Sequence, residues 1–480
     1  MRGIWRAILV STLACVLGSC GGDGGGGNSG GPTPTPVSTA PRFTSGGTAS
    51  VVENLSGSFY TATASDPQGD PISFSISGGP DADKFVLDSN GNLRFDRPPN
   101  FDLPIDAGRD NVYSLTLRAS AGGETASLSL VVTVTNDREG VKVTRAVAGL
   151  PEAIDMSFIH NAVELLVATA DGRVLRVNPE TGTSVEDVFI RDNRVAGDIL
   201  AISYGFPSQA YQEGIYIVTH SPAEGLWLQG FDASTGRIFS QKLGDGLATA
   251  PTASIISQNE LYVAIGDPAG NLAQNSSSPY GKLFKVGVVC LYCQASLPRP
   301  GKLVGLAALW GDGIQSPGGF SPQSDYLILA DRGSTNFHEL NRFRRDWQPL
   351  DFGWPFYEGA TPLSNDPPAA VNGPYIVYPL GEGRVAGEGV VAGLFNDGNF
   401  LEALGMNYIF GDVNGSIFAA PRGFFTDGIL HGADEIENRT EDFAPDIGMI
   451  DSPVAFASGR GTSHFFILDQ DGEIFRVESE

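Results

Sequence analysis

The sequence is short of cysteine, histidine and positive charge. Only four cysteines and five histidines occur in 480 residues, and 55 acidic residues outnumber 30 basic ones, for a formal charge of −25. This balance disfavours nucleic acid and anionic lipid as direct partners and suits cations and neutral ligands. The sequence has no G-x-x-x-x-G-K-[ST] loop, and its one G-x-S-x-G match, around Ser29, lies in a low-complexity stretch. Phosphoryl transfer and acyl transfer therefore find no support.

Long apolar runs are also missing, except at the start of the chain. Residues 1–19 combine Arg2 and Arg6 with an apolar run from Ala7 to Leu17 and small residues after it. This pattern predicts a secretory signal peptide, which is too short to span a membrane. Its removal would take away two positive charges and change the formal charge from −25 to −27.

The segment Leu17-Gly18-Ser19-Cys20 resembles a bacterial lipobox. The resemblance implies cleavage before Cys20 and lipidation of its thiol, and the alternative is an ordinary signal peptide with an incidental cysteine. Residues 20–41 consist mainly of Gly, Ser, Pro and Thr, a composition typical of a flexible linker. We expect an exported protein that a lipid anchor holds at the bacterial membrane, facing the periplasm or the cell surface.

Two further cysteines, Cys290 and Cys293, stand in the segment VVCLYCQ. In an exported protein this isolated C-x-x-C pair favours a local disulfide. A redox pair would need a strand–helix context, and a structural metal site would need a second pair of ligands nearby.

Residues 42–139 read as a separate all-β module. Polar and apolar residues alternate in Ile72 to Ser77, Tyr113 to Ser120 and Ser127 to Thr135, with turn residues between them, which predicts a β-sandwich. Carboxylates gather near the ends of these strands, and hard oxygen ligands on rigid loops suit Ca²⁺. The residues concerned are Glu53, Asp66, Asp70, Asp96 and Asp137.

The segments VVEN, ASDPQGD, PPNFDLPIDAGRDNVYSLTLRAS and VTVTNDRE make the module similar to a cadherin-like (Ig-like) repeat. The resemblance implies Ca²⁺ ligands at Glu53, Asp66, Asp96 and Asp137, and the alternative is a solvated acidic rim. Gln68 replaces a common acidic residue, and no second repeat follows. A single repeat favours a spacer or docking role over adhesion.

Residues 140–480 repeat one pattern six times: an apolar strand, a turn that usually carries Asp or Gly, and often a return strand. Most copies start about 45 to 65 residues apart, which is within or slightly above the range for four-stranded propeller blades. Radial sheets leave only short, protected edges. The pattern predicts a six-bladed β-propeller. The copies start at Glu164, Gly214, Glu260, Asp325, Asn407 and His464.

The propeller segment resembles the glucose/sorbosone dehydrogenase family, soluble quinoproteins that use pyrroloquinoline quinone (PQQ). The resemblance is carried by ELYVAIGDPAGNLAQ with YGKLFKV, SDYLILADRGSTNFHELNRF with FGWPFYEG, YPLGEGRVAGEGVVAG with NYIFGDVNGSIF, and DQDGEIFRV. It implies hydride transfer from a sugar to the quinone while a histidine base removes the hydroxyl proton.

The segment that should carry this base, Ala248 to Asn259, has no histidine. The acidic residue that supports the base in the family matches Asp267, which equally fits a turn-forming carboxylate. His220 is the candidate replacement base, on the expectation that it lies at a loop tip near the central funnel. We expect no histidine within reach of Asp267 in the central opening.

The cofactor has three carboxylates, which call for arginine or lysine partners. The Arg-Asn pair that binds it in the family aligns with Gln315 and Ser316, so that fixed charge is lost. Arg332 and Arg384 are the remaining cations expected near the central axis, with a surface position as the alternative. The family's Ca²⁺ site, made of backbone carbonyls, would fall at Gly333 and Ser334.

Two hypotheses follow. In the first, the chain is a degenerate, non-catalytic propeller that binds a sugar, glycan or protein at the cell surface. In the second, it is an active quinoprotein oxidoreductase that oxidises sugars or alcohols at a rebuilt site. Loss of both the base and the Arg-Asn pair favours the first hypothesis.

Overall fold

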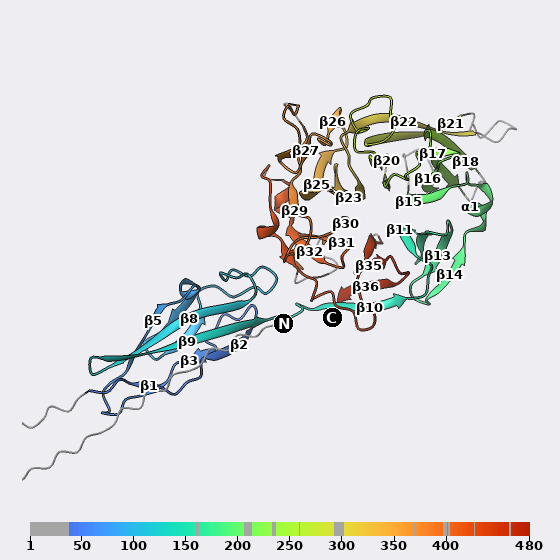
Figure 1. Ribbon diagram of the computed structural model, residues 1–480. Coiled ribbons are helices and arrows are strands. Elements are labelled where there is room, and N and C mark those ends of the chain that lie inside the picture. Colours follow the sequence, from blue (N-terminus) through green and yellow to red (C-terminus); the bar gives the residue numbers. More distant parts are fainter. Residues whose placement is uncertain are drawn as a thin grey trace, which may run out of the picture.

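The computed structural model describes an almost entirely β-stranded protein (Figure 1). The one α-helix in the described part is α1 (Val188–Asn193). No helix among those residues is both long and apolar enough to cross a bilayer. The prediction of an all-β fold is confirmed. The described residues are 38–159, 163–205, 214–232, 237–258, 260–291, 302–368, 371–396, 401, 404–426, 428–459 and 462–480.

The N-terminal module has two main sheets that enclose one core. Phe85, Phe95, Tyr113 and Leu117 are buried between them. The larger sheet has the order β2 (Thr48–Val52), β9 (Glu124–Thr135), β8 (Val112–Ala121) and β5 (Ser73–Gly78). The smaller has the order β3 (Tyr60–Thr61), β7 (Asn92–Phe95) and β6 (Phe85–Leu87), and β1 (Arg42–Phe43) pairs with β4 (Ala64–Ser65). The 3₁₀ helix η1 (Ala82–Lys84) precedes β6.

From Val141 onward, six sheets stand around a central axis (Figure 1). The first sheet has the order β11 (Ala153–Phe158), β12 (Leu165–Thr169), β13 (Val174–Asn178) and β14 (Thr183–Glu186). The second has the order β15 (Asp198–Gly205), β16 (Gly214–Ser221), β17 (Gly225–Asp232) and β18 (Arg237–Gly244). The third has the order β19 (Ala253–Gln258), β20 (Glu260–Ile265), β21 (Lys282–Leu291), β22 (Lys302–Asp312) and β26 (Leu350–Asp351).

The other three sheets are β23 (Pro317–Gln323), β24 (Tyr326–Asp331), β25 (Phe337–Arg344) and β29 (Ile376–Pro379); β30 (Val390–Phe395), β31 (Asn407–Asp412), β32 (Ile417–Pro421) and β33 (Glu437–Asn438); and β34 (Pro453–Ser458), β35 (His464–Asp469), β36 (Ile474–Ser479) and β10 (Val141–Val147). Connections contain the pair β27 (Tyr357–Glu358) and β28 (Thr361–Pro362), and the 3₁₀ helices η3 (Arg422–Phe425) and η4 (Ala433–Glu435). The predicted β-propeller is confirmed.

Each of the six sequence repeats corresponds to the second and third strands of one sheet. The apolar strand of every copy is the second strand, namely β12, β16, β20, β24, β31 or β35, and the return strand is the third. These second strands are almost wholly buried, as in Leu165–Thr169, because each lies in the middle of a sheet that packs between two neighbouring sheets. Burial on both faces explains why these strands read as continuous apolar runs.

The chain closes its own ring. Strand β10, the first after the N-terminal module, pairs antiparallel with β36, the last strand, in register from Val141 opposite Ser479. The backbone N–H of Glu480 also donates to the carbonyl of Gly140 at 2.9 Å. The sixth sheet therefore contains strands from both ends of the propeller segment, and their pairing closes the ring.

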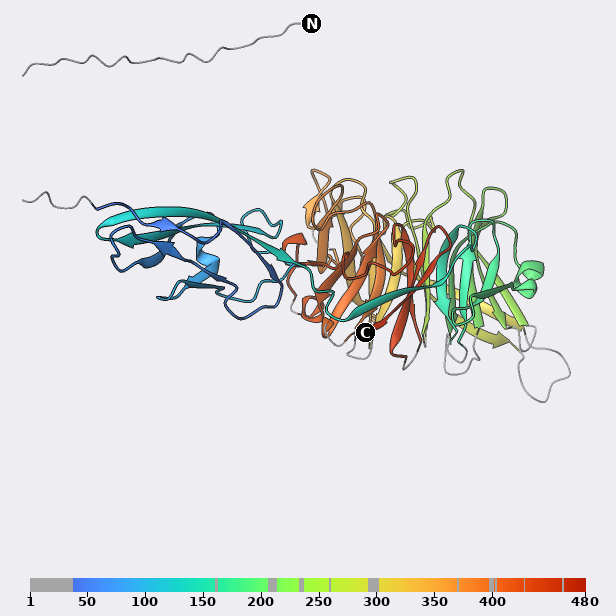
Figure 2. The same cartoon turned by 90° about the horizontal axis from the view of Figure 1, so that it is seen from below.

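The N-terminal module lies against the side of the propeller (Figure 2). Arg138 donates to the carbonyl of Asp442 at 2.8 Å, and Arg384 donates to the carbonyls of Asp102 and Ile436, both at 2.8 Å. The expectation that Arg384 lies near the central axis is therefore wrong. Its guanidinium satisfies main-chain carbonyls at the boundary between the two parts of the chain.

Candidate functional site

A channel of about 720 Å³ runs along the propeller axis. Its lining comes from the first strand of all six sheets: β11, β15, β19, β23, β30 and β34. First strands of neighbouring sheets do not pair with each other, so their side chains project into the space between them. The volume falls within the range of pockets that hold small ligands.

Charged groups are few on this lining. Among the described lining residues, only Asp155, Asp198 and Arg332 carry a formal charge, and none is a histidine. The expectation that no histidine lies within reach of Asp267 stays a prediction, because Asp267 does not line the channel and His160 lies outside the described residues. A channel with two carboxylates and one cation offers little attraction to a multiply charged anion.

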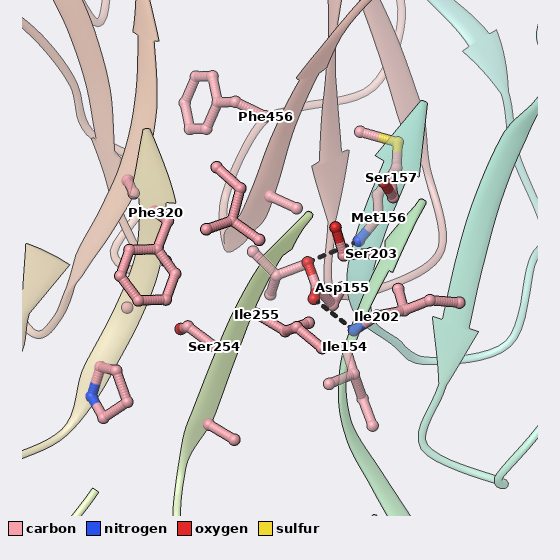
Figure 3. A pocket seen from close by; sticks show the side chains of 18 of the residues that line it. Ile154, Asp155, Met156, Ser157, Ile202, Ser203, Ser254, Ile255, Phe320 and Phe456 are labelled. Atoms are coloured by element: carbon pink, nitrogen blue, oxygen red, sulfur yellow. Dashed lines mark hydrogen bonds between the residues drawn. The ribbon is translucent and has the colours of Figure 1, made fainter. Parts of the chain in front are cut away.

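Asp155 projects from β11 into the channel (Figure 3). Its Oδ1 accepts the N–H of Met156 at 2.8 Å, and its Oδ2 accepts the N–H of Ile202, on the neighbouring strand β15, at 2.8 Å. Removal from bulk water raises the pKa of Asp155 to about 7, and the two N–H donors only partly offset this effect. The side chain is thus a carboxyl that can exchange a proton near neutral pH.

Hydroxyl side chains link the first strands in the same way. Ser157 Oγ accepts the N–H of Tyr204 at 2.9 Å, and Ser203 Oγ accepts the N–H of Ser257 at 3.0 Å. With Asp155, these side chains satisfy backbone donors that have no strand partner. The lone pairs and hydroxyl protons they have left are available to a ligand in the channel.

Aromatic rings also contribute to the lining. Phe320 from β23, on the far side of the channel from Asp155, and Phe456 from β34, the first strand of the sheet next to β11, are half-buried (Figure 3). Phe158, at the end of β11, adds a third ring to the lining. The channel therefore combines apolar faces with hydroxyl and carboxyl groups.

Arg332 lies on the channel lining, as the sequence predicts, but its side chain is held in place. Its Nε donates to the carbonyl of Val390 at 3.1 Å. A Cβ at Gly389 would lie 3.1 Å from Arg332 Cδ, so the absence of a side chain at Gly389 gives the arginine its space. One cation fixed to a main-chain carbonyl does not supply the charge and hydrogen bonds of the Arg-Asn pair that the family resemblance implies.

Asp267 belongs to the scaffold of its loop. Its carboxylate is 5% exposed and accepts four backbone N–H groups, from Ala269, Gly270, Leu272 and Ala273, at 2.7–3.2 Å. It is not among the residues that line the channel. All the bonds made by this carboxylate hold the segment between β20 and β21.

In three other blades an aspartate ends the second strand and also accepts backbone N–H groups. Asp331 accepts the N–H groups of Gln315 and Ser316, at 2.9 and 2.6 Å. Asp412 accepts those of Glu388 and Gly389, and Asp469 accepts those of Asp451 and Ser452. In these three sheets the aspartate holds the backbone of the residues that immediately precede the first strand. The conspicuous aspartates of the repeat are therefore structural groups.

The segments that align with the family's cofactor and Ca²⁺ residues lie beside one of these aspartates. Gln315 Nε2 donates to Ser334 Oγ, and Ser316 Oγ lies 3.1 Å from Thr252 Oγ1. The N–H of Ser334 donates to Glu358 at 2.7 Å, and that of Gly333 donates to His338 Nδ1 at 3.1 Å. Amide donors of this loop thus converge on Glu358. The suggested carbonyl site for Ca²⁺ at Gly333 and Ser334 stays a prediction.

His220 does not reach the channel. It lies in β16, the second strand of its sheet, is 1% exposed, and accepts the N–H of Leu247 through Nε2 at 3.2 Å. Burial lowers its pKa below the ordinary value. The expectation that His220 lies at a loop tip facing the funnel is wrong, because the residue belongs to strand β16 and its side chain is buried.

The predicted Ca²⁺ ligands of the N-terminal module differ in burial and in their hydrogen-bond partners. Glu53 is buried and accepts the N–H groups of Phe101 and Asp137, at 2.8 and 3.0 Å. Asp66 accepts the N–H groups of its own turn, while the side chains of Asp96 and Asp137 are exposed. None of the four belongs to the one group of three acidic ligands that the described residues bring together.

Several expectations fall on residues that the structure does not describe. The signal peptide, the lipidated Cys20 and most of the linker precede residue 38, and Cys293 lies between two described segments. The side chain of Cys290 is likewise outside the described part, so the disulfide remains a prediction.

No protein-family profile matches the chain, and no curated protein does. Solved structures similar to it include the PQQ-bound aldose sugar dehydrogenase of Streptomyces coelicolor (16% identity, TM-score 0.49, 71% of this chain and 99% of that chain). The soluble aldose sugar dehydrogenase of Escherichia coli in its apo form has 15% identity, a TM-score of 0.49, and coverage of 71% and 100%. Human protocadherin-24 EC1-2 has 14% identity, a TM-score of 0.21, and coverage of 42% and 94%.

At these identities the similarity carries no information about activity. By its own strand order, the chain is a β-propeller preceded by a smaller β-module. The residues that would hold PQQ do not fit that cofactor, since three carboxylates would meet a described lining with one cation, Arg332, and two carboxylates. The chemistry of the channel has to be argued from its own side chains.

Proposed function

We propose that this chain is an exported, lipid-anchored binding protein whose propeller holds a neutral ligand in its central channel without quinone-dependent catalysis. The observation that carries the proposal is the lining itself, with rings, hydroxyl groups and little charge in its described part. Rings suit the apolar faces of a ligand, and hydroxyl groups suit its polar edges. A neutral saccharide has both features, and the strongly acidic chain would repel an anionic one.

The proposed role of the N-terminal module is to hold the propeller away from the membrane. It lies between the linker and the propeller in the chain, and its contacts with the propeller orient the two parts (Figure 2). The cadherin-like character of the module and the anchoring at Cys20 belong to this proposal and are supported by the sequence motifs.

The binding function is tested by calorimetric titration of the purified chain with a panel of neutral oligosaccharides. We expect saturable binding, a loss of at least about tenfold in affinity in Phe456→Ala, and no change in the control Val185→Ala, since Val185 is 68% exposed on the outer strand β14. Equal affinity in wild type and Phe456→Ala would place the ligand outside the channel and contradict the proposal.

A second candidate function is oxidation of a sugar or alcohol at a rebuilt site, and Asp155 is the observation that favours it. A carboxyl with a pKa of about 7 on a channel lining is suited to take a proton from a bound hydroxyl group. Sugar-dependent dye reduction that is lost in Asp155→Asn would support this second function over the first.

A further inference from the structure

The two ends of the channel carry different side chains, and strand register shows which lining residues lie at each end. In every sheet the first strand runs antiparallel to the second, so each first strand begins beside the end of its partner. We call the end where the first strands begin the charged end and the opposite one the ring end. The charged end is defined by Asp155, Asp198, Thr252 and Arg332, and the ring end by Phe158, Tyr204 and Phe395.

The charged end holds every formal charge of the described lining. Asp155 pairs with Ala168, the next-to-last residue of β12, and Asp198 pairs with His220, the next-to-last residue of β16. Arg332 directly follows β24. All three therefore lie where the second strands finish, and they offer carboxylate acceptors and one guanidinium at the same end of the channel.

The ring end holds aromatic side chains instead. Phe158 pairs with Leu165, the first residue of β12, and Tyr204 pairs with Ile215, the second residue of β16. Phe395 occupies the corresponding position of β30, opposite the second residue of β31. None of the described lining residues at this end carries a formal charge. Rings therefore dominate its recognition surface.

Neighbouring sheets place these groups at matching levels. Asp155 and Ser157, two residues apart on β11, accept N–H groups that are also two residues apart on β15 and in the same order. The first strands of these two sheets therefore run in the same direction. The hydroxyl groups of Thr252 and Ser316, which directly precede β19 and β23, lie 3.1 Å apart. The beginnings of the first strands thus gather at one end.

The two kinds of surface are separated by a length that a small ligand can span. Asp155 and Phe158 are three residues apart on one strand, or about 10 Å at about 3.3 Å per residue. Phe320 and Phe456, in the middle of β23 and β34, extend the aromatic surface toward the charged end. A hydroxyl group buried against these rings without a partner would cost free energy, so a ligand that is polar along its whole length matches only part of the channel.

We propose that the ligand of the channel is an aryl glycoside, with its sugar at the charged end and its aromatic aglycone at the ring end. This inference rests on the proposed function, because it names the class of neutral ligand that the channel holds. At the charged end, carboxylates accept hydrogen bonds from sugar hydroxyl groups, and such bonds are stronger than those to neutral acceptors. At the ring end, the aglycone gains offset or edge-to-face contacts with Phe158 and Tyr204.

The test is calorimetric titration of the purified chain with phenyl glycosides of several hexoses, each compared with the methyl glycoside of the same hexose. Wild type should bind the phenyl glycoside of its preferred sugar at least about tenfold more tightly, because an aromatic ring is buried. Phe158→Leu and Tyr204→Leu keep apolar volume but remove a ring, so each should reduce this preference to about threefold or less and leave the affinity for the methyl glycoside unchanged.

A variant at the charged end should behave differently. Asp198→Asn, at an exposed side chain of the lining, should weaken the binding of both glycosides by the same factor, about threefold or more, and leave their ratio as in wild type. The control Val185→Ala, on the outer strand β14, should change neither affinity.

Three results would overturn the inference. Equal affinity of wild type for phenyl and methyl glycosides would refute it and leave the proposed function intact, because the channel would still hold a sugar. A phenyl preference that survives in both leucine variants would place the aglycone away from the ring end. Failure of every glycoside and oligosaccharide to bind would contradict the proposed function itself, and this inference would fall with it. Two leucine variants keep the test valid if one of them does not fold.

Discussion

Replacing Asp267 by asparagine tests whether the carboxylate of this residue serves the stability of the fold or catalysis. The carboxylate accepts two N–H groups at Oδ1 and two at Oδ2. An asparagine side chain keeps one acceptor and turns an NH₂ group toward the other two donors. Two hydrogen bonds to a charged acceptor are lost, at about 1.5–3 kcal/mol each, so we expect a destabilisation of about 3–6 kcal/mol.

The assay is urea-induced unfolding of wild type and Asp267→Asn, followed by fluorescence and circular dichroism. The control is Asp471→Asn, because the exposed Asp471 accepts a single N–H, from Glu473 at 3.2 Å, and its loss should cost less than about 1 kcal/mol. If Asp267→Asn unfolds within about 1 kcal/mol of wild type, the loop does not depend on this carboxylate and our reading of Asp267 is refuted.

Three further outcomes are expected. Arg439→Gln leaves buried carboxylates unpaired and should destabilise the chain by about 3–5 kcal/mol in urea unfolding, whereas Arg109→Gln removes a half-exposed ion pair with Asp434 and should cost below about 1 kcal/mol. Asp155→Asn should gain stability relative to wild type as pH rises from 4 to 8, because the raised pKa of Asp155 makes its ionisation unfavourable to the fold; a constant difference would contradict this. Ser203→Ala should cost about 1 kcal/mol by freeing the N–H of Ser257, and an unchanged urea midpoint would refute that bridge.

The part of the fold that the sequence predicts well is the middle of each blade. Strands such as Leu165–Thr169 are buried on both faces and are followed by tight turns, so composition and turn residues identify them together. The aspartates at or just after the ends of such strands are also evident in the sequence. The sequence alone does not distinguish a carboxylate that holds a loop from a catalytic one. The difference lies in which N–H groups surround Asp267, and these depend on the folded loop.

The channel and the buried carboxylates that pair with Arg439 could not be predicted in the same way. The first strands mix small, polar and apolar residues, as in Ala153–Phe158, so their periodicity is weak. Nothing in the sequence around Arg384 indicates that its side chain reaches the carbonyl of Asp102. Its position at the boundary with the N-terminal module therefore could not be predicted. Asp102 and Asp442 are likewise far apart in the sequence, and only tertiary packing brings them together.

The proposed function requires that the channel of the propeller holds a neutral ligand and does not hold PQQ. The most direct measurement is titration of the purified chain with PQQ and Ca²⁺, followed by cofactor absorbance and then by dye reduction with a panel of aldoses. Our account predicts no saturable binding at tens of micromolar PQQ and no sugar-dependent reduction. Tight binding with sugar-dependent dye reduction that is lost in Asp155→Asn would contradict it and establish a rebuilt catalytic site.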